Sequence, residues 1–431
     1  MSARVDVLVV GAGPGGMAAA TVAAEAGRRV CLVDGGTAPG GQIWRGYSTP
    51  SASRSPHGRE FVRWSERLQR SGCAVWQGWQ VVDHPAEGVL RVERDGECRD
   101  VGYERLILAT GARERFLPFP GWTLPGVMGA GGVQALMKAG LEARGRRVVV
   151  AGSGPLLLAV AAGLHDAGAT VAGIYEQAAA GRLARFALRM LRHPGKLAEG
   201  AGYRLKTRKA AYRTGAWVVR AEGKDRVERV TVTDGRREWQ VECDWLACGF
   251  HLVPNLELPL LLGCSVAGGY VAVDALQQSS VANVACVGEL TGIGGLEKAL
   301  AEGQIAGWAA AGREAQARAM TAEAGRGRRF GAELEAAFAL REELRTLADA
   351  ETVVCRCEDV PYGALAGKVG WREAKLHTRC GMGACQGRVC GAVTEFLFGW
   401  DAKSGRPPIY PALMSTMAEG AEETKAAAQR R

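Results

Sequence analysis

The sequence lacks the features of a membrane-spanning or secreted protein. No uninterrupted apolar run reaches the about 18 residues that a transmembrane helix needs. The start of the chain, Met1 to Val10, reads as a strand and lacks the basic and then apolar layout of a secretory signal. We therefore expect a cytoplasmic protein without a transmembrane segment.

The residue patterns of several kinds of catalysis are also missing. No Cys-x-x-Cys pair occurs, which excludes the redox disulfide of the disulfide reductases. The six histidines are scattered, and His251, beside the turn at Gly249, is best explained as a packing residue. Neither a Ser-His-Asp set nor a pair of carboxylates for acid–base work can be recognised. We predict that this chain carries no catalytic side chains for substrate chemistry.

Basic residues exceed acidic ones, but their distribution does not suit nucleic acid. The formal net charge is +9, and the Lys and Arg residues are scattered apart from crowding between Arg182 and Arg213 and at the C-terminal tail. No basic groove carries stacking aromatic side chains, as a nucleic-acid site requires. We predict no nucleic-acid partner.

The composition is that of a globular protein with an unusual group of cysteines. Apolar residues make up 47% of 431 residues, enough for two or three domains. Seven of the twelve cysteines are dispersed and read as small buried hydrophobic residues. The remaining five crowd between residues 355 and 390, and in a reducing compartment such clustering indicates a metal site rather than disulfides. The dispersed seven are Cys31, Cys73, Cys98, Cys243, Cys248, Cys264 and Cys286.

The N-terminal segment predicts a nucleotide-binding unit. Val5 to Val10 is a largely apolar run, typical of a strand buried in a parallel sheet. The turn Gly11-Ala12-Gly13-Pro14-Gly15-Gly16 follows, and then an Ala-rich helix from Met17 to Ala26. Arg29 to Val33 supplies a second strand that ends at Asp34. The order is strand, glycine turn, helix, strand and acid.

Each of these residues has a physical reason within the unit. Gly11 permits the tight turn, and Gly13 lets the backbone approach a pyrophosphate at the helix N-terminus. Gly16 lets the helix and strand pack closely, and Asp34 can bond a ribose hydroxyl. This unit therefore predicts a bound dinucleotide.

Three later segments identify the dinucleotide as FAD by resemblance. They are Gly40 to Arg45 (Gly-Gly-Gln-Ile-Trp-Arg), Leu106 to Ala112, and Asn283 to Glu289 with the glycines after it. Together they resemble the two-dinucleotide-binding-domain flavoproteins, which include glutathione and thioredoxin reductases. The resemblance implies that Glu289, with one extra methylene, replaces the Asp that bonds the ribityl chain of FAD. The implied FAD-binding residues are Gly11, Gly13, Pro14, Gly15, Gly16, Asp34, Gly41, Gln42, Arg45, Thr110, Gly111, Gly288 and Glu289.

A second nucleotide-binding unit follows the first. Arg146 to Ala151 leads into Gly152-Ser153-Gly154 and a helix, and a strand from Thr170 to Tyr175 ends at Glu176. Leu157 replaces the third glycine. In the resembled family this unit binds NAD(P)H, which would place Gly152, Gly154 and Glu176 at a second site. A retained fold that binds no nicotinamide, or another nucleotide, explains the sequence equally well.

Residues between Gly181 and Arg213 depart from this second unit and read as a helical insertion rich in Leu, Arg and Lys. An insertion of this kind is most economically an interface or a cover.

The clustered cysteines predict a metal centre. Cys355 and Cys357 open the cluster, and Cys380-Gly-Met-Gly-Ala-Cys385-Gln-Gly-Arg-Val-Cys390 closes it. Thiolates suit iron–sulfur clusters, zinc and Cu(I), and Cys-x-Cys is tighter than zinc-finger spacing. The segment resembles the bacterioferritin-associated-ferredoxin-like [2Fe–2S] domain. The resemblance gives ligand roles to Cys355, Cys357, Cys385 and Cys390, with Cys380 as the alternative fourth ligand, and zinc remains open.

Taken together, these motifs resemble the A or α subunit of heteromeric flavin dehydrogenases, such as opine oxidase, D-hydroxyproline dehydrogenase and hydrogen cyanide synthase. The resemblance implies an FAD-dependent oxidoreductase subunit with a [2Fe–2S] cluster. It would accept electrons from the flavin of a β subunit resembling a glycine or D-amino-acid oxidase, and pass them to an external acceptor. The resemblance also allows FMN at a subunit interface, peripheral association with the respiratory chain, and a small third subunit.

Two other functions stay open at this point. One is a self-sufficient NAD(P)H-dependent flavin and iron–sulfur reductase, and the other is a non-enzymatic metal-binding interaction module.

We predict an α/β fold with a doubly wound, Rossmann-like FAD domain, an inserted second nucleotide-binding domain and a small, mainly helical cysteine domain. The expected boundaries are 1–118 and 251–316 for the FAD domain, 119–250 for the insertion, 317–350 for a helical linker and 351–431 for the cysteine domain and tail.

Overall fold

The chain forms two compact units in a computed structural model that describes residues 3–47, 56–401 and 405–418. Unit 1 contains Met1–Arg113, Pro254–Ala332 and Lys403–Arg431, and unit 2 contains Glu114–Val253 and Glu333–Ala402. The tail after residue 418, with Lys425, Arg430 and Arg431, lies outside the described residues.

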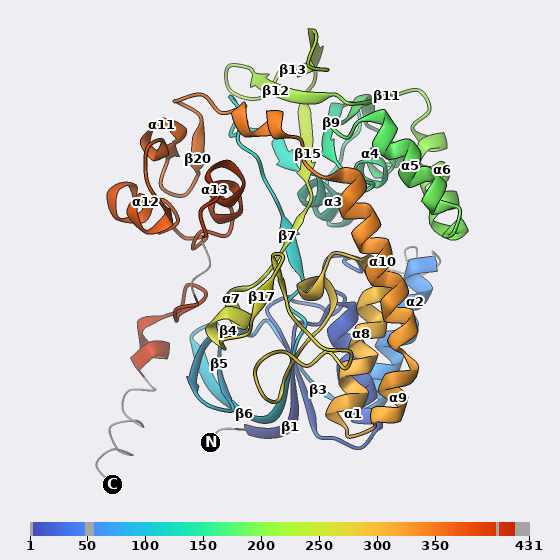
Figure 1. The fold of residues 1–431 in the computed structure, drawn as a ribbon, viewed down its shortest axis with the longest axis vertical. Helices are drawn as coiled ribbons and strands as arrows, with labels where there is room; N and C mark the ends of the chain where they lie inside the picture. Colours follow the sequence, from blue (N-terminus) through green and yellow to red (C-terminus); the bar gives the residue numbers. More distant parts are fainter. Residues whose placement is uncertain (1–2, 48–55, 402–404, 419–431) are drawn as a thin grey trace. The chain divides into compact units, whose positions relative to one another are not determined.

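Unit 1 is built on a seven-stranded sheet (Figure 1). Strands run in the order β3-β2-β1-β6-β5-β4, and β19 pairs with the C-terminal part of β6. The pairs β3-β2, β2-β1, β1-β6 and β6-β19 are parallel, while β4 and β5 pair antiparallel. The strands are β1 (Ala3–Val10), β2 (Val30–Asp34), β3 (Ala74–Gln77), β4 (Gln80–Ala86), β5 (Val89–Arg94), β6 (Glu97–Leu108) and β19 (Val284–Cys286).

Both faces of this sheet are covered. Val7 and Val9 of β1 belong to one buried apolar cluster, and Leu8 and Val10 belong to another. Alternate residues of a strand point to opposite faces, so an unbroken apolar run is what a doubly covered strand needs. The expectation of a buried strand here is met.

Helix α1 (Pro14–Glu25) packs tightly against α8 (Gly295–Ala310) because both present small residues. A methyl group built on Gly303 would stand 2.1 Å from the carbonyl oxygen of Gly15, and one on Gly307 would stand 2.5 Å from that of Ala19. The other elements of unit 1 are α2 (Pro56–Arg70), α7 (Glu257–Leu261), β17 (Val266–Ala267), β18 (Tyr270–Val271), η2 (Gly288–Thr291) and α9 (Glu314–Ala319).

Unit 2 repeats the strand, helix and strand scheme. A five-stranded parallel sheet has the order β11-β10-β9-β15-β8, and a separate antiparallel sheet has the order β12-β13-β14. The parallel strands are β8 (Val127–Gly129), β9 (Arg147–Ser153), β10 (Thr170–Glu176), β11 (Ala211–Thr214) and β15 (Trp245–Phe250). The antiparallel strands are β12 (Trp217–Glu222), β13 (Arg229–Thr233) and β14 (Glu238–Glu242).

The helices of unit 2 include the insertion that the sequence indicated. The helical segment expected between Gly181 and Arg213 folds as α5 and α6, but its last three residues belong to strand β11. Strands β7 and β16 carry the chain between the units, and α10 begins in unit 1 and ends in unit 2. The bounds are α3 (Ala130–Lys138), α4 (Leu156–Asp166), α5 (Ala180–Met190), α6 (Pro194–Lys206), α10 (Thr321–Phe338), β7 (Ala112–Glu114) and β16 (Leu252–Pro254).

The cysteine region is a small, mainly helical part of unit 2 with its own core. Val354, Leu365, Ala374 and Val393 are fully buried together with three of the cysteines. The indole Nε1 of Trp122 donates to the carbonyl oxygen of Val353 at 2.6 Å. Its elements are η3 (Glu342–Thr346), β20 (Val353–Cys355), β21 (Val360–Pro361), α11 (Tyr362–Leu365), α12 (Trp371–Thr378) and α13 (Cys390–Phe398).

The predicted α/β fold class is confirmed, with a mixed seven-stranded sheet, a parallel five-stranded sheet and a helical C-terminal cysteine region. Among the described residues, no helix is both long and apolar enough to cross a membrane. Five of the seven dispersed cysteines are buried, as expected of small hydrophobic residues, while Cys73 and Cys98 are half-buried.

Candidate cofactor sites and cysteine centre

The first glycine turn has the geometry that the sequence indicated. Gly11 has a φ of 102°, and a methyl group on it would stand 2.3 Å from the carbonyl oxygen of Ala109. A methyl group on Gly16 would stand 1.8 Å from the carbonyl oxygen of Gly11, so the helix and strand pack as closely as expected. Only glycine fits either position.

Gly13 differs from these two because its surroundings are open. It is the N-cap of α1 with an ordinary φ of −70°, and a methyl group there would meet nothing within 4 Å. No side chain caps the helix at this end. Uncapped N–H groups at a helix N-terminus attract anions, so the turn fits the pyrophosphate of a dinucleotide.

Asp34, the acid at the end of β2, is held beside the same turn. Its carboxylate accepts hydrogen bonds from the backbone N–H of Ala12 at 2.5 Å and of Gly36 at 2.6 Å. Gly41 also lies here, since a methyl group on it would stand 3.0 Å from Cα of Gly13. In the Gly40 to Arg45 segment, Trp44 is buried and the guanidinium of Arg45 donates to the side-chain oxygen of Gln42 at 3.2 Å.

Two further predicted residues lie at the carboxyl end of the neighbouring strand β6. The hydroxyl of Thr110 donates to the carbonyl oxygen of Asn255, and the amide of Asn255 donates back to the carbonyl oxygen of Thr110 at 2.7 Å. Gly111 has a φ of 67°. Asn255 was not predicted as a site residue. The only signal for it was its position just after the chain returns to unit 1 at Pro254.

Glu289, after β19, faces the N-terminus of α8. Its two carboxylate oxygens accept hydrogen bonds from the backbone N–H groups of Gly294 and Gly295, each at 3.0 Å. Burial raises the pKa of this carboxyl, while Lys298 and the two N–H groups oppose the rise. The carboxylate thus accepts hydrogen bonds from the free N–H groups at the N-terminus of α8. It lies at the edge of the sheet where β1, β6 and β19 end, which is where ligands bind in open α/β sheets.

A buried ionic network beside Glu289 was missed by the sequence reasoning. The ammonium of Lys298 donates to the carbonyl oxygen of Gly288 at 2.7 Å, to the hydroxyl of Thr291 and to the carboxylate of Glu302 at 2.8 Å. Glu302 also accepts from Arg328 at 2.9 Å. The spacing of four residues between Lys298 and Glu302 was the available signal.

The second glycine turn holds its acid in the same way as the first, but buries it. Glu176 is 1% exposed, and its carboxylate accepts from the backbone N–H groups of Gly154 and Ala178, both at 2.8 Å. Burial raises the pKa of Glu176 to about 7. Gly152 has a φ of 132°, and Leu157, which replaces the third glycine, is buried in the core.

Residues 338–341, just after α10, cross this second turn. The hydroxyl of Ser153 donates to the carbonyl oxygen of Phe338 at 2.9 Å. The side-chain amide of Gln177 donates to Ser153 and to the carbonyl oxygens of Phe338 and Ala339, and its oxygen accepts from the N–H of Arg341. The imidazole of His251 is hydrogen-bonded to Phe338 as well, which fits its predicted packing role.

The structure sorts the five clustered cysteines into a trio and a pair. The sulfurs of Cys355, Cys380 and Cys390 lie within 4.8 Å of one another, and all three residues are buried. Cys357 is exposed, and its sulfur is hydrogen-bonded to the N–H and thiol of Cys385. The predicted ligands therefore fall in both groups, and Cys380, the alternative ligand, belongs to the trio.

The trio is electrostatically suited to a thiolate. Hydrogen bonds from the thiols of Cys380 and Cys390 lower the pKa of Cys355 to about 2, with help from the N–H groups of Gly381 and Glu358. The absence of a side chain at Gly383 lets the loop between Cys380 and Cys385 approach Cys357, since a methyl group on Gly383 would stand 2.3 Å from Cβ of Cys357. Sulfur ligands with backbone N–H donors fit an iron–sulfur cluster or another soft metal ion.

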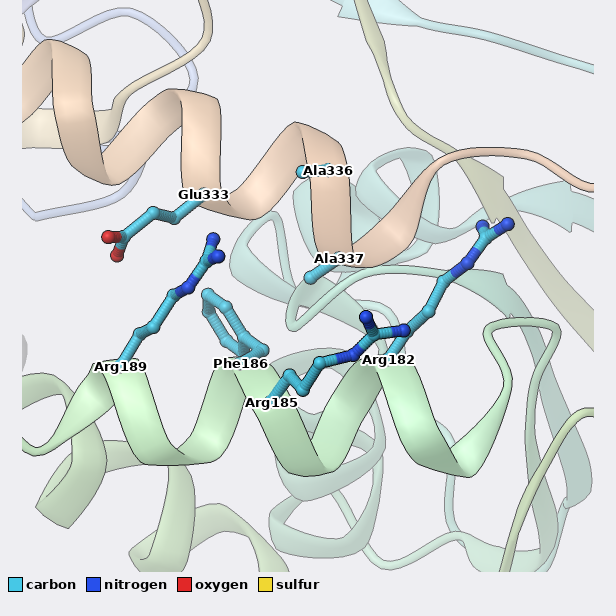
Figure 2. A pocket seen from close by; sticks show the side chains of 7 residues that line it. All are labelled: Arg182, Arg185, Phe186, Arg189, Glu333, Ala336 and Ala337. Atoms are coloured by element: carbon cyan, nitrogen blue, oxygen red, sulfur yellow. The ribbon is translucent and has the colours of Figure 1, made fainter.

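A pocket of about 160 Å³ lies away from these residues, between α5 and the end of α10 (Figure 2). Arg182, Arg185, Phe186 and Arg189 of α5 extend toward α10, which contributes Glu333, Ala336 and Ala337. None of the predicted cofactor residues lines this pocket.

Comparison with known proteins places these features in a wider context. The family model described as pyridine nucleotide-disulphide oxidoreductase matches residues 5–315. The chain is 36% identical to hydrogen cyanide synthase subunit HcnB of Pseudomonas aeruginosa, over 89% of this chain and 90% of that protein. It is 35% identical to the A subunit of opine oxidase from Rhizobium meliloti, over 96% of this chain and 98% of that protein.

Among solved structures, L-proline dehydrogenase from P. horikoshii has a similar fold. The TM-score is 0.69 at 19% identity, covering 97% of this chain and 80% of that one.

Proposed function

This chain belongs to the pyridine nucleotide-disulphide oxidoreductase family, and on that premise we propose that it is the electron-transferring α subunit of a heteromeric amine or amino-acid dehydrogenase. Its substrate class would be an opine or D-hydroxyproline, oxidised on the partner. The family supports FAD as cofactor, and the thiol cluster supports a [2Fe–2S] centre.

The cysteine centre is the observation that carries the proposal. A flavin fold alone would suit many reductases, whereas five thiols gathered after that fold suit a carrier of single electrons. FAD when bound accepts electrons in pairs and releases them singly, and a [2Fe–2S] cluster transfers one at a time. A chain that holds both cofactors can therefore convert two-electron transfer into one-electron transfer.

The chain's own residues have defined roles in this proposal. The open N-terminus of α1 at Gly13 would hold the pyrophosphate, and Asp34 would hold the adenosine ribose. The Thr110-Gly111 turn, Glu289 and the N-terminus of α8 would border the flavin end. Cys355, Cys357, Cys385 and Cys390 would ligate the cluster, and Cys380 is the alternative candidate for the fourth ligand position.

The enclosed second turn supports a protein partner, rather than NAD(P)H, as the electron donor. Glu176 would have to bond a nucleotide ribose, but it is 1% exposed and residues 338–341 cross the turn, whereas Asp34 of the first turn is only half-buried. The names of the two relatives each describe one subunit of a larger enzyme, which supports a partner chain.

Co-expression tests this function directly. The chain is produced together with a candidate partner that resembles a glycine or D-amino-acid oxidase, and the complex is assayed for dye reduction with opines and hydroxyproline. We expect a stable complex that is active only when both chains are present. A chain that stays monomeric with every such partner, and supports no dye reduction, would contradict the proposal.

Anaerobic addition of NADH or NADPH separates this function from a self-sufficient reductase. We expect the flavin absorbance of the purified chain to stay unchanged, because the second turn is enclosed. Bleaching of the flavin by either nucleotide would instead support the reductase.

A further inference from the structure

Helix α5 carries two unusual surfaces in addition to the face that packs on the protein. Leu183, Phe186 and Met190 face inward, and Phe186 stacks edge-on against Phe338 with ring centroids 5.4 Å apart. With 3.6 residues per turn, the remaining positions separate into one apolar and one basic stripe.

The apolar stripe is exposed. Ala184, Leu188 and Leu191 follow one another at intervals of four and three residues, so they share a face of the helix. Leu188 is 68% exposed and Leu191 is 66% exposed. Exposed leucines at this spacing indicate an interaction surface, for a membrane or for another protein.

The basic stripe lies next to it. Arg185 and Arg189 of α5, and Arg192 in the turn that follows it, have the same spacing one position later, and none has an acidic partner within 4 Å in the described part of the chain. Arg185 donates only to the carbonyl oxygen of Gly181. Within the described ranges, no ion pair neutralises these three guanidinium groups, although Glu333 lines the same pocket as Arg185 and Arg189.

The pocket in Figure 2 adjoins this basic stripe. Its polar lining consists of Arg182, Arg185, Arg189 and Glu333, and Phe186 with two alanines provides an apolar wall. A phospholipid could contact both stripes at once, with its phosphate group beside the arginines and its apolar chains against the leucines.

Charge extends along the following helix. Between residues 182 and 209 the only acidic residue is Glu199, and α6 exposes Leu197 and Leu205. The nine basic residues of this stretch are Arg182, Arg185, Arg189, Arg192, Lys196, Arg204, Lys206, Arg208 and Lys209.

We propose that the α5–α6 hairpin docks this protein on a membrane surface rich in anionic phospholipid. The leucine stripe of α5 enters the headgroup boundary, and the arginine stripe with its pocket binds headgroup phosphates. An exposed apolar stripe flanked by arginines is the pattern of helices that lie in the interface plane. A protein partner would be expected to offer acidic side chains, and it is an outcome of the test below.

Vesicle flotation of the full chain tests the proposal. Vesicles of phosphatidylcholine alone are compared with vesicles that also contain phosphatidylglycerol, at low and high salt. We expect the protein to float only with the anionic vesicles and to be released by salt, since exposed charges are screened. No flotation with the anionic vesicles would overturn the proposal and leave a protein partner as the explanation.

Variants locate the binding surface. Arg185→Glu/Arg189→Glu/Arg192→Glu should lower the partition coefficient about 100-fold or more. Leu188→Ser/Leu191→Ser should lower it about 10-fold or more. Lys224→Glu/Arg226→Glu/Arg236→Glu reverses three exposed charges elsewhere in unit 2 and should change little.

If the control variant lost as much vesicle binding as the α5 variants, or if the α5 variants lost none, the assignment of the binding surface to α5 would be refuted. Flavin and iron content per chain should be unchanged in all variants, so a failure here is distinguishable from a failure of the proposed function.

Discussion

At the residue scale, the first glycine turn separates glycines that the backbone requires from a glycine that we propose serves binding. Gly11 has a left-handed backbone and a carbonyl oxygen in the way of any side chain. Gly13 has an ordinary backbone and open space around its Cα. The two positions should therefore respond differently to a methyl group.

Gly13→Ala is expected to lose most of the bound flavin while its melting temperature in the flavin-free form stays near that of the parent, because the methyl group occupies ligand space only. Heat-released flavin per chain and thermal unfolding measure the two effects. Gly11→Ala should fail to fold stably, and Gly27→Ala, with a φ of 88° but open surroundings, is the control for backbone strain. Full flavin content in Gly13→Ala would place the pyrophosphate elsewhere.

The buried Lys298–Glu302 pair gives a second prediction at this scale. Lys298→Met leaves a fully buried carboxylate with Arg328 as its remaining cation, and should lower the free energy of unfolding by about 3–5 kcal/mol. Urea unfolding of the flavin-free chain measures it. Arg318→Met breaks an exposed pair at the same four-residue spacing and should cost no more than about 1 kcal/mol. Similar losses in both variants would show that burial of the Lys298 pair does not matter.

At the element scale, the loop between α12 and α13 decides how the thiols meet. It contains Cys380 and Cys385, and Cys390 begins α13. Positive φ angles at Arg379, Gly381 and Gln386 turn the backbone so that sulfurs on both sides of the loop approach β20. Spacing in the sequence could not show which thiol of this loop meets Cys355.

Single alanine variants of the loop discriminate the fourth ligand. We expect Cys380→Ala to keep iron and acid-labile sulfide near the parent level, and Cys390→Ala to lose both. Chemical analysis of anaerobically purified protein, with the electron paramagnetic resonance spectrum after reduction, provides the measurement. The reverse result would assign the ligand role to Cys380.

At the scale of the whole molecule, the enclosed acid of the second turn should affect global stability. The pKa of Glu176 is raised by burial from 4.5 to about 7, so the folded state binds its proton more tightly than the unfolded state does. Between those two pH values the unfolded chain loses the proton first. The free energy of unfolding must then fall as the pH rises, by at most about 3 kcal/mol for this group.

Glu176→Gln should flatten that part of the curve, because the amide does not titrate. Denaturant unfolding of the parent and the variant from pH 5 to pH 8 measures the difference. If both lose stability equally over this range, Glu176 does not titrate as its burial indicates.

The sequence by itself determined the local chemistry: the strand, glycine turn and acid of each nucleotide unit, the fold class, the helical insertion and the grouping of the cysteines. These follow from periodicity and from glycines with a steric function, which act over a few residues. The proposed domain boundaries at 118/119 and 250/251 and the assigned cofactor residues stay predictions.

Only the tertiary structure decided which distant residues meet. It brought Cys380 beside Cys355, Lys298 beside the carbonyl oxygen of Gly288, and residues 338–341 across the second glycine turn. It also left Leu188 of α5 and Leu191 just after it exposed, although their spacing would suit a buried face equally well. Such contacts depend on how packed elements share space, and a pattern along the chain contains no information on which partner a side chain finds.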